Sequence, residues 1–294
     1  MTRLRFLGTG TSQGVPIIAC QCPVCKSRDP RDKRFRSAAF VEYEGLNILI
    51  DAGPDFRSQM LAADIRHLDA ILLTHNHKDH TGGLDDVRSF NYIDRKAAEI
   101  YCEERVLKSL KNDYSYAFEA EKYPGAPEWH VHLIDERPFR VESLENSGEL
   151  VWVHDKGYFY RQPDGSLAHT GEIVSEASHV HPNVIPIRGL HGQMPVLGFR
   201  FGNIAYITDM SSIEDTELEK LRGLKHLTLN TVSYNPHHSH FSLQEAVALA
   251  QRIGAEHTWL THLSHTFPTH GEFVRELRQY GNIEPAYDGL VIED

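Results

Sequence analysis

Apolar residues along the chain come in short runs separated by polar turns, a pattern typical of a sheet protein with intervening helices. These runs predict strands over residues 4–7, 37–43, 46–50, 70–73, about 185–190, 196–201, 204–207, 227–232, 258–260 and 289–292. The capping box from Ser242 to Glu245 predicts the start of a helix that Gly254 ends, and a last helix is expected over about 271–280. Charged residues and an apolar stripe over 84–118 predict mostly helix. The pattern indicates an α/β protein.

Potential metal ligands follow four of the predicted strands. A His-x-His-x-Asp-His motif spans residues 75–80, directly after the apolar run 70–73, and single ligand residues follow three further strands at His191, Asp209 and His262. Neutral imidazole and carboxylate groups are ligands that divalent metals such as zinc take readily. Because an α/β sheet carries its functional residues at strand ends, we expect these side chains to form a metal site.

Asp51 also follows a predicted strand, 46–50, close in sequence to the histidine motif. Its position allows two interpretations. Its carboxylate could accept the second ring N–H of a ligand histidine, or it could cap a turn. The glycine-rich segment 8–16 contains neither of the nucleotide-binding glycine motifs. We therefore expect that segment to be a turn close to the active site.

Three of the four cysteines lie within six residues, as Cys20-Gln21-Cys22-Pro23-Val24-Cys25. Three thiolates at this spacing can hold one tetrahedral zinc if a fourth ligand comes from elsewhere, and such a closed site would be structural. The alternative is three reduced thiols in a loop. Either form indicates a reducing compartment, so we expect a cytoplasmic protein.

Composition is that of an ordinary soluble protein, with 40% hydrophobic and 24% charged residues. The net charge of −11 argues against long nucleic acids as partners, and no apolar run is long enough to cross a membrane. No repeat or linker marks a boundary, so we expect a single domain over 1–294. The long irregular region at about 99–181 is expected to be an insertion that forms a lid or an oligomer contact.

The strand-end ligand set resembles that of the metallo-β-lactamase-fold hydrolases over nearly the whole chain. The resemblance is closer to one branch, the cyclic ribose phosphate phosphodiesterases associated with carbon–phosphorus lyase. Those proteins carry a Gly-x-Gly…Gln-Gly-Val-Pro turn before Cys-x-Cys-x2-Cys, as in 8–25, and a Thr-His-x-Ser-His motif, as in 261–265. The resemblance implies a four-layer αβ/βα sandwich with two mixed β-sheets.

The resemblance also implies a role for each candidate residue. Two divalent active-site metals, zinc or manganese, would be bound by two ligand sets with one bridging carboxylate: His75, His77 and His191 for the first, Asp79, His80 and His262 for the second, and Asp209 as the bridge. One structural zinc would be bound by Cys20, Cys22, Cys25 and His265. His240 would contact the phosphate or protonate the leaving oxygen, although it could instead be a surface residue, and Asp79 is counted as catalytic as well as a ligand.

These roles predict a dimetal phosphodiesterase that hydrolyses small, cyclic phosphodiesters such as ribose 1,2-cyclic phosphate by metal-bound hydroxide. The branch also suggests a homodimer. One alternative is a transfer RNA 3′-end endonuclease, which should have a protruding arm and a basic surface. Another is a non-hydrolytic accessory protein resembling the pyrroloquinoline quinone biosynthesis type, which shares a similar cysteine loop. The intact set of seven active-site ligands favours hydrolysis, and a β-lactamase proper is not expected.

Overall fold

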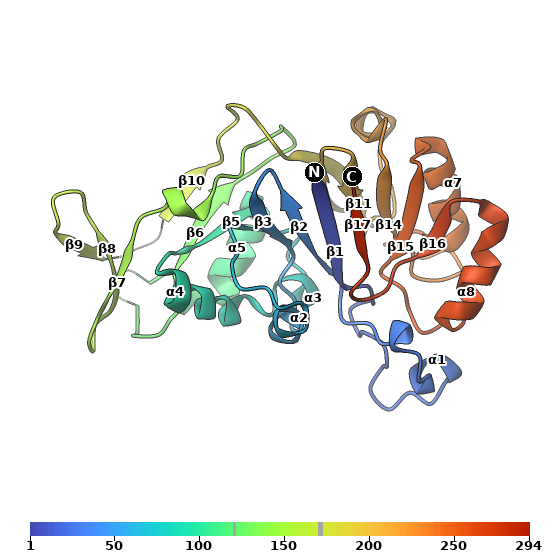
Figure 1. The fold of residues 1–294 in the computed structure, drawn as a ribbon, viewed down its shortest axis with the longest axis horizontal. Coiled ribbons are helices and arrows are strands. Elements are labelled where there is room, and N and C mark those ends of the chain that lie inside the picture. The colour runs from blue at the N-terminus through green and yellow to red at the C-terminus, as the bar shows by residue number, and fades with distance from the viewer. Residues whose placement is uncertain (120–121, 170–172) are drawn as a thin grey trace. The chain divides into compact units, whose positions relative to one another are not determined.

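The computed structural model describes residues 1–119, 122–169 and 173–294, and these divide into two compact units (Figure 1). The first unit contains both ends of the chain, residues 1–44 and 183–294, and the second contains residues 45–182. Within the described ranges, no helix combines the length and the apolar character that crossing a membrane requires.

The first unit contains two groups of paired strands. β1 (Thr2–Gly8) pairs antiparallel with both β2 (Ala38–Tyr43) and β17 (Val291–Glu293). The six-stranded sheet has the order of its numbering: β11 (Ile185–His191), β12 (Met194–Phe201), β13 (Ile204–Tyr206), β14 (His226–Asn230), β15 (His257–Thr261) and β16 (Ile283–Pro285).

The direction of these strands brings several strand ends to one edge of the sheet. β13, β14, β15 and β16 are parallel, whereas β12 is antiparallel to both β11 and β13. β11 therefore runs in the same direction as β13. The carboxyl ends of β11, β13, β14 and β15 lie at the same edge, which is where the predicted ligands His191, Asp209 and His262 follow their strands.

Helices α7 (Leu243–Ile253) and α8 (His270–Leu277) lie along the six-stranded sheet (Figure 1). The predicted capping box at Ser242 and Glu245 starts α7, and Gly254 ends it with a left-handed φ of 71°. The buried positions of α7 follow helical spacing and pack into one apolar core with the strands: Leu243, Ala246, Val247 and Ala250. Within the same unit, ring contacts connect β1 and β2 with the six-stranded sheet, Phe6 to Tyr206 and Tyr43 to Phe201.

Short helices complete the first unit. The cysteine loop contains α1 (Pro23–Lys26), and the one-turn helix η1 (Pro30–Asp32) follows it. α6 (Asp215–Leu218) and η5 (Glu219–Leu221) lie between β13 and β14, and η6 (Arg278–Tyr280) extends α8.

The second unit is built on five parallel strands in the order β10-β6-β5-β4-β3. Their bounds are β3 (Leu46–Ile50), β4 (Ala70–Leu72), β5 (Ala98–Cys102), β6 (Trp129–Leu133) and β10 (Ile173–Glu176). The connecting helices are α2 (Phe56–Ala63), α3 (Lys78–Thr81), η2 (Leu84–Val87), α4 (Arg88–Asp94), α5 (Glu104–Asp113), η3 (Ser115–Ala117) and η4 (Leu144–Asn146). A separate antiparallel sheet contains β7 (Leu150–Val153), β8 (Gly157–Arg161) and β9 (Leu167–His169).

The prediction of mostly helix over 84–118 is wrong at one point, because β5 separates α4 from α5. Four of its five residues are buried. A parallel strand buried on both faces has a short apolar run without alternation, which is easily taken for part of a helix. The region 99–181 thus contributes β5, β6 and β10 to the parallel sheet and contains β7–β9 besides. Its role as a lid or oligomer contact, like the single-domain organisation, stays a prediction.

Candidate metal centres

The histidine motif lies after β4 in the second unit. His77 lies directly before α3, at its N-cap position, and Asp79 and His80 lie within this short helix. The ring centroid of His75 lies 4.7 Å from that of His77 and 4.2 Å from that of His80, and His75 and His80 are fully buried. The Asp79 carboxylate comes within 3.3 Å of His80 Nε2. The structure therefore brings together all four candidate ligands of this motif.

Asp51, after β3, holds the other nitrogen of His80. Its carboxylate lies 2.6 Å from His80 Nδ1 and accepts the Thr74 N–H at 2.9 Å and the Thr74 hydroxyl at 2.9 Å. Complete burial raises the pKa of Asp51, while His80 and Thr74 act in the opposite direction. Of the two roles considered for Asp51, the structure therefore supports the first, in which its carboxylate orients a ligand histidine. With Nδ1 held by Asp51, the Nε2 nitrogen of His80 is the one available to a metal.

Close backbone packing fixes this turn. A Cβ atom at Gly53 would lie 1.9 Å from the Asp79 carbonyl oxygen, and one at Gly83 would lie 2.1 Å from the Gly53 carbonyl oxygen. Only glycine fits at both positions. Backbone therefore passes close to both glycines, and this packing fixes the position of the helix turn that carries Asp79 and His80.

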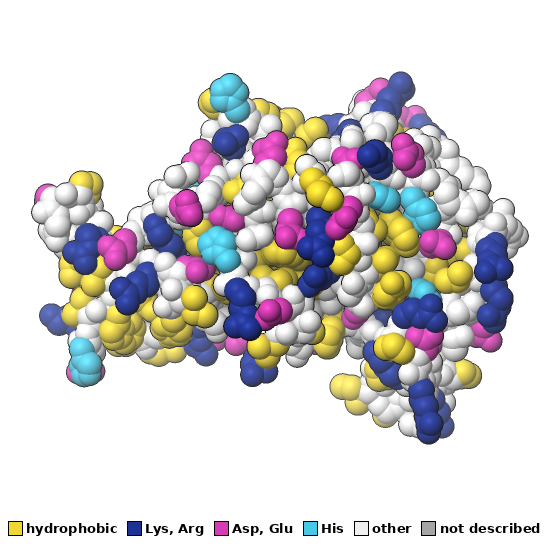
Figure 2. All heavy atoms as spheres, in the orientation of Figure 1, with side chains coloured by type: hydrophobic (Ala, Val, Ile, Leu, Met, Phe, Trp, Pro, Cys, Tyr) yellow, Lys and Arg dark blue, Asp and Glu magenta, His cyan; other side chains and the backbone are white. Residues whose placement is uncertain are grey.

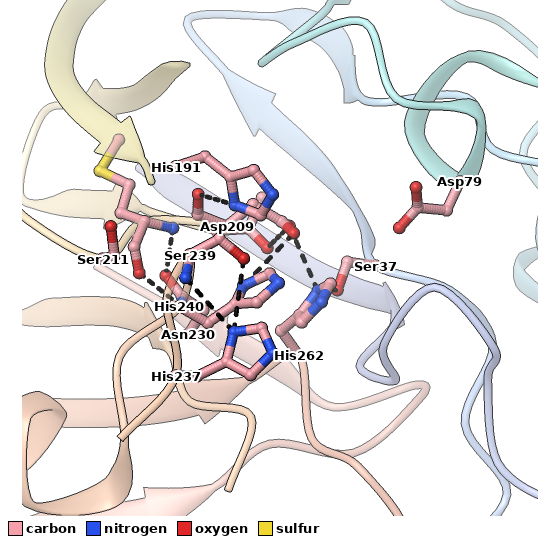
Figure 3. Close-up of polar contacts among 12 residues, drawn as sticks. Ser37, Asp79, His191, Asp209, Ser211, Asn230, His237, Ser239, His240 and His262 are labelled. Carbon is pink, nitrogen blue, oxygen red and sulfur yellow. Dashed lines mark hydrogen bonds and ion pairs between the residues drawn. The ribbon is translucent and has the colours of Figure 1, made fainter. Parts of the chain in front are cut away.

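In the first unit, three histidines surround the carboxylate of Asp209 (Figure 3). Asp209 Oδ2 lies 3.2 Å from His262 Nδ1, and Asp209 Oδ1 lies 3.6 Å from His240 Nδ1. His191 Nδ1 lies 3.0 Å from the Asp209 carbonyl oxygen, which directs its Nε2 away from the backbone. The Thr208 hydroxyl donates to Asp209 Oδ2 at 2.7 Å. This cluster contains every candidate active-site residue that the sequence predicted in the first unit.

The backbone at these strand ends is unusual. Asp209 and His262 each have a φ of 57°, and Asp51 in the second unit has a φ of 63°. Left-handed conformations are uncommon for residues other than glycine, and they persist where the surroundings fix them, often at functional sites. Asn230, at the end of β14, supplies such support by accepting the Met210 N–H at 2.8 Å and donating to the Met210 carbonyl oxygen at 2.9 Å.

Two polar residues near Asp209 and His262 were not predicted from the sequence. Asn230 holds the turn after Asp209, and its position at the end of a strand parallel to β13 is a signal that could have identified it. Ser37 Oγ lies 3.1 Å from His262 Nδ1 and also donates to the Gly10 carbonyl oxygen at 3.0 Å. Ser37 and His262 are 225 residues apart, so no local pattern indicates this pair.

His240 is a largely buried, neutral imidazole. Burial, together with the neighbouring His262 and His191, lowers its pKa to about 3, although Asp209 acts in the opposite direction. Its ring stacks on that of His262 with centroids 4.7 Å apart. A neutral ring can accept a proton or a hydrogen bond, whereas donation to a leaving oxygen requires protonation. A phosphate anion beside the ring would favour that protonation.

The cysteine loop meets the segment after β15. The Sγ atoms of Cys20 and Cys22 lie 3.2 and 3.4 Å from His265 Nδ1, and the four candidate ligand atoms, including Cys25 Sγ, all lie within 4.8 Å of one another. The Cys25 N–H donates to Cys22 Sγ and lowers the pKa of Cys22 to about 6, while burial raises the pKa of Cys25 to about 11.

The donor chemistry fits metals at all three places. Imidazole nitrogens and carboxylate oxygens suit zinc or manganese, and three thiols with one imidazole suit a tetrahedral zinc. The cysteine set leaves no position for substrate, which is typical of structural zinc sites. His265 lies three residues after His262, so a zinc there would stiffen the segment that carries an active-site candidate. The assignment of residues to individual metals stays a prediction.

Comparisons with known proteins agree with this arrangement of strand-end ligands. The family model described as a beta-lactamase superfamily domain matches residues 46–263. The chain belongs to this superfamily. A solved diphosphatase of the PhnP family is 34% identical and has a TM-score of 0.79, and the match covers 100% of this chain and 98% of that one. This beta-lactamase superfamily member therefore lies in the PhnP branch, which fits the branch that the sequence motifs predicted.

Two further proteins are similar to this chain over nearly its whole length. An octanoyltransferase of Porphyromonas gingivalis (strain ATCC BAA-308 / W83) is 35% identical over 291 residues, which cover 98% of this chain and 51% of that protein. The chain spans about half, or less, of the length of the first curated relatives that it matches. Zinc-bound PqqB from Methylobacterium extorquens has a TM-score of 0.70 at 15% identity over 99% of this chain and 100% of that one, which shows a shared fold.

Family membership confirms the predicted fold class, the metallo-β-lactamase sandwich. The match to a PhnP-family diphosphatase also supports the prediction of a metal-dependent hydrolase.

Proposed function

We propose that this protein is a dimetal phosphodiesterase that hydrolyses small, cyclic phosphodiesters such as ribose 1,2-cyclic phosphate. The observation that carries the proposal is the match to a PhnP-family diphosphatase over the full length of both chains. Diphosphate and phosphodiester hydrolysis share their central step, which is water attack on a phosphorus atom with displacement of an oxygen. One type of centre can therefore serve both substrates.

The ligand roles in the proposal are those that the resemblance implies, with Asp209 as the bridging carboxylate. Two bound divalent ions would supply a water activated near neutral pH and would neutralise charge on the phosphate oxygens. The carboxylates of Asp79 and Asp209 would cancel only part of the charge of two divalent ions, so the centre would stay cationic and attract a phosphodiester anion. His240, which lies against Asp209, would bind the phosphate or protonate the leaving oxygen.

A cavity in the first unit supports a small substrate. It has a volume of about 320 Å³ and lies beside His240 and His262. Cavities of about 300–1,000 Å³ are typical of small-molecule sites. Hydroxyl and amide groups form much of its wall and could hydrogen-bond the hydroxyls of a sugar phosphate: Thr11, Ser12, Gln13, Ser233, Ser264 and Thr266.

The charge distribution disfavours a transfer RNA substrate. On the face that Figure 2 shows, Lys and Arg side chains are interspersed with Asp and Glu side chains rather than gathered in one patch. The whole chain has a net charge of −11. Binding of long nucleic acids usually rests on a basic surface that contacts many phosphates. The metals (zinc or manganese in the active site, zinc at the cysteines), a homodimer and a cytoplasmic location complete the proposal.

A substrate comparison tests the proposal. Protein loaded with metal is assayed on an aryl phosphodiester, ribose 1,2-cyclic phosphate, 2′,3′-cyclic nucleotides and precursor tRNA, with Asp209→Asn as the inactive control. We expect turnover of the small diesters and none of the tRNA. Turnover of tRNA alone would contradict the proposal. If protein carrying both metals hydrolyses none of these substrates, the accessory role is favoured.

A further inference from the structure

A second cluster of metal-binding side chains lies in the second unit, on strands that carry none of the residues discussed so far. Glu99 on β5 is aligned with His130 on β6, and His132 lies two residues further along the same face of β6. One ligand atom from each of the three side chains can be chosen so that all lie within 4.8 Å of one another.

The contacts converge on one oxygen of Glu99. Glu99 Oε2 lies 3.1 Å from His130 Nδ1 and 2.5 Å from His132 Nε2, while the Ser147 hydroxyl donates to Glu99 Oε1. The carboxylate is 6% exposed, and the two rings are partly exposed. Oε1 is therefore held by the protein, and Oε2 with one nitrogen from each ring faces a common point.

An outer hydrogen bond orients His132. Ser175 on β10 is aligned with His132, and its Oγ lies 3.1 Å from His132 Nδ1. The Tyr101 ring stacks on the His132 ring, with their centroids 4.5 Å apart. Histidines that bind metal usually have their second ring nitrogen held in this way, because it fixes the tautomer and the direction of the ligand nitrogen.

The cluster opens into a cavity. The space has a volume of about 340 Å³ and is also lined by Tyr101, Arg140, Glu142 and Glu176. Two imidazoles and one carboxylate are a common protein ligand set of zinc sites that keep one position open. The cavity gives solvent or a small anion access to that fourth position.

We propose that Glu99, His130 and His132 bind a zinc ion whose fourth position faces this cavity. Zinc bonds to nitrogen and oxygen are ~2.0–2.2 Å long, so ligand atoms around a tetrahedral ion lie ~3.4 Å apart. The separation of Glu99 and His130 is already close to that value. His132 has to move away from Glu99 by less than about 1 Å, so that the ion replaces their hydrogen bond.

The test counts zinc equivalents in the full-length protein. Protein stripped by a chelator is titrated with zinc against a chromophoric competitor, and the wild type is compared with a His130→Asn/His132→Gln double variant. We expect the variant to bind one zinc per chain fewer. Equal zinc content in a folded variant would overturn the site, with folding checked by circular dichroism.

Two single variants sharpen the result. Ser175→Ala leaves all three ligands in place but removes the partner of His132 Nδ1, so we expect zinc affinity at this site to fall about 10–100-fold. Glu142→Gln is the matched control, because it removes a charge from the same cavity without touching the three ligands. A loss in Glu142→Gln as large as in the double variant would overturn the proposal in favour of general attraction to an acidic cavity.

Discussion

Replacing Asp51 by Asn tests how the second unit prepares His80 for a metal. Asp51 adopts a left-handed backbone conformation, which Asn tolerates better than most residues, so the substitution keeps the turn. The Asn carbonyl oxygen can still accept from Thr74, but its amide group then faces His80 Nδ1. An amide N–H requires an unprotonated Nδ1, which moves the ring proton to Nε2, the nitrogen that should bind the metal.

The magnitude follows from the contacts that are lost. The Asp51–His80 hydrogen bond involves a fully buried carboxylate, and bonds of this charged type contribute about 1.5–3 kcal/mol. Removing such a partner of a metal-binding histidine typically weakens metal binding about 10–100-fold. Because the substitution also favours the wrong tautomer, we expect a loss toward about 100-fold, or roughly 2.7 kcal/mol.

The assay is a metal titration of the chelator-stripped protein against a chromophoric competitor. Asp64→Asn is the matched control, since Asp64 also has a left-handed backbone, with a φ of 53°, but its side chain is 75% exposed and pairs only with Arg66 among the ion pairs of the described residues. We expect wild-type affinity in that control. An Asp51→Asn protein that is folded and binds metal as tightly as the wild type would refute the role given to Asp51.

Three further predictions concern other parts of the chain. Cys22→Ser should remove one zinc per chain and lower the melting temperature, whereas Cys102→Ala should leave the zinc content unchanged; retention of that zinc in Cys22→Ser would refute the cysteine site. His240→Ala should reduce kcat on a phosphodiester by about 10²–10⁴-fold with unchanged metal content, and wild-type turnover would refute a catalytic role for this side chain. Burial and the nearby Arg34 lower the pKa of His270 from 6.5 to about 4, so the unfolded chain binds the proton first as the pH falls. His270 should therefore lower the free energy of unfolding by about 2 kcal/mol between pH 8 and pH 5, and His270→Asn, compared by urea unfolding, should lack that part of the loss; an equal loss in both proteins would contradict it.

The sequence predicted the parts of the fold and the candidate site that depend on local order. Asp209 and His262 follow apolar strands directly, so their place at a sheet edge could be inferred from strand direction alone. The same holds for α7, whose first and last turns contain their own capping residues.

Contacts between distant segments could not be predicted in this way. Ser37 reaches His262 because Gly10 forms isolated β-bridges with the neighbours of both, Arg36 and Leu263. Glu99 faces His130 only through the register of β5 and β6. The contact of the cysteines with His265 spans 245 residues, and the sequence supplied it through family resemblance rather than spacing.

The central claim is that phosphodiester hydrolysis depends on two divalent ions at the strand-end ligands. The most direct test uses the His130→Asn/His132→Gln variant, which lacks the zinc site proposed in the second unit. The active-site ions are stripped while the cysteine-bound zinc is retained, metal is then added stepwise, and hydrolysis of ribose 1,2-cyclic phosphate is measured. We predict no turnover by the stripped protein and a rate that rises until two ions per chain are bound. Full turnover without added metal, or a rate that is complete at one ion per chain, would contradict the account.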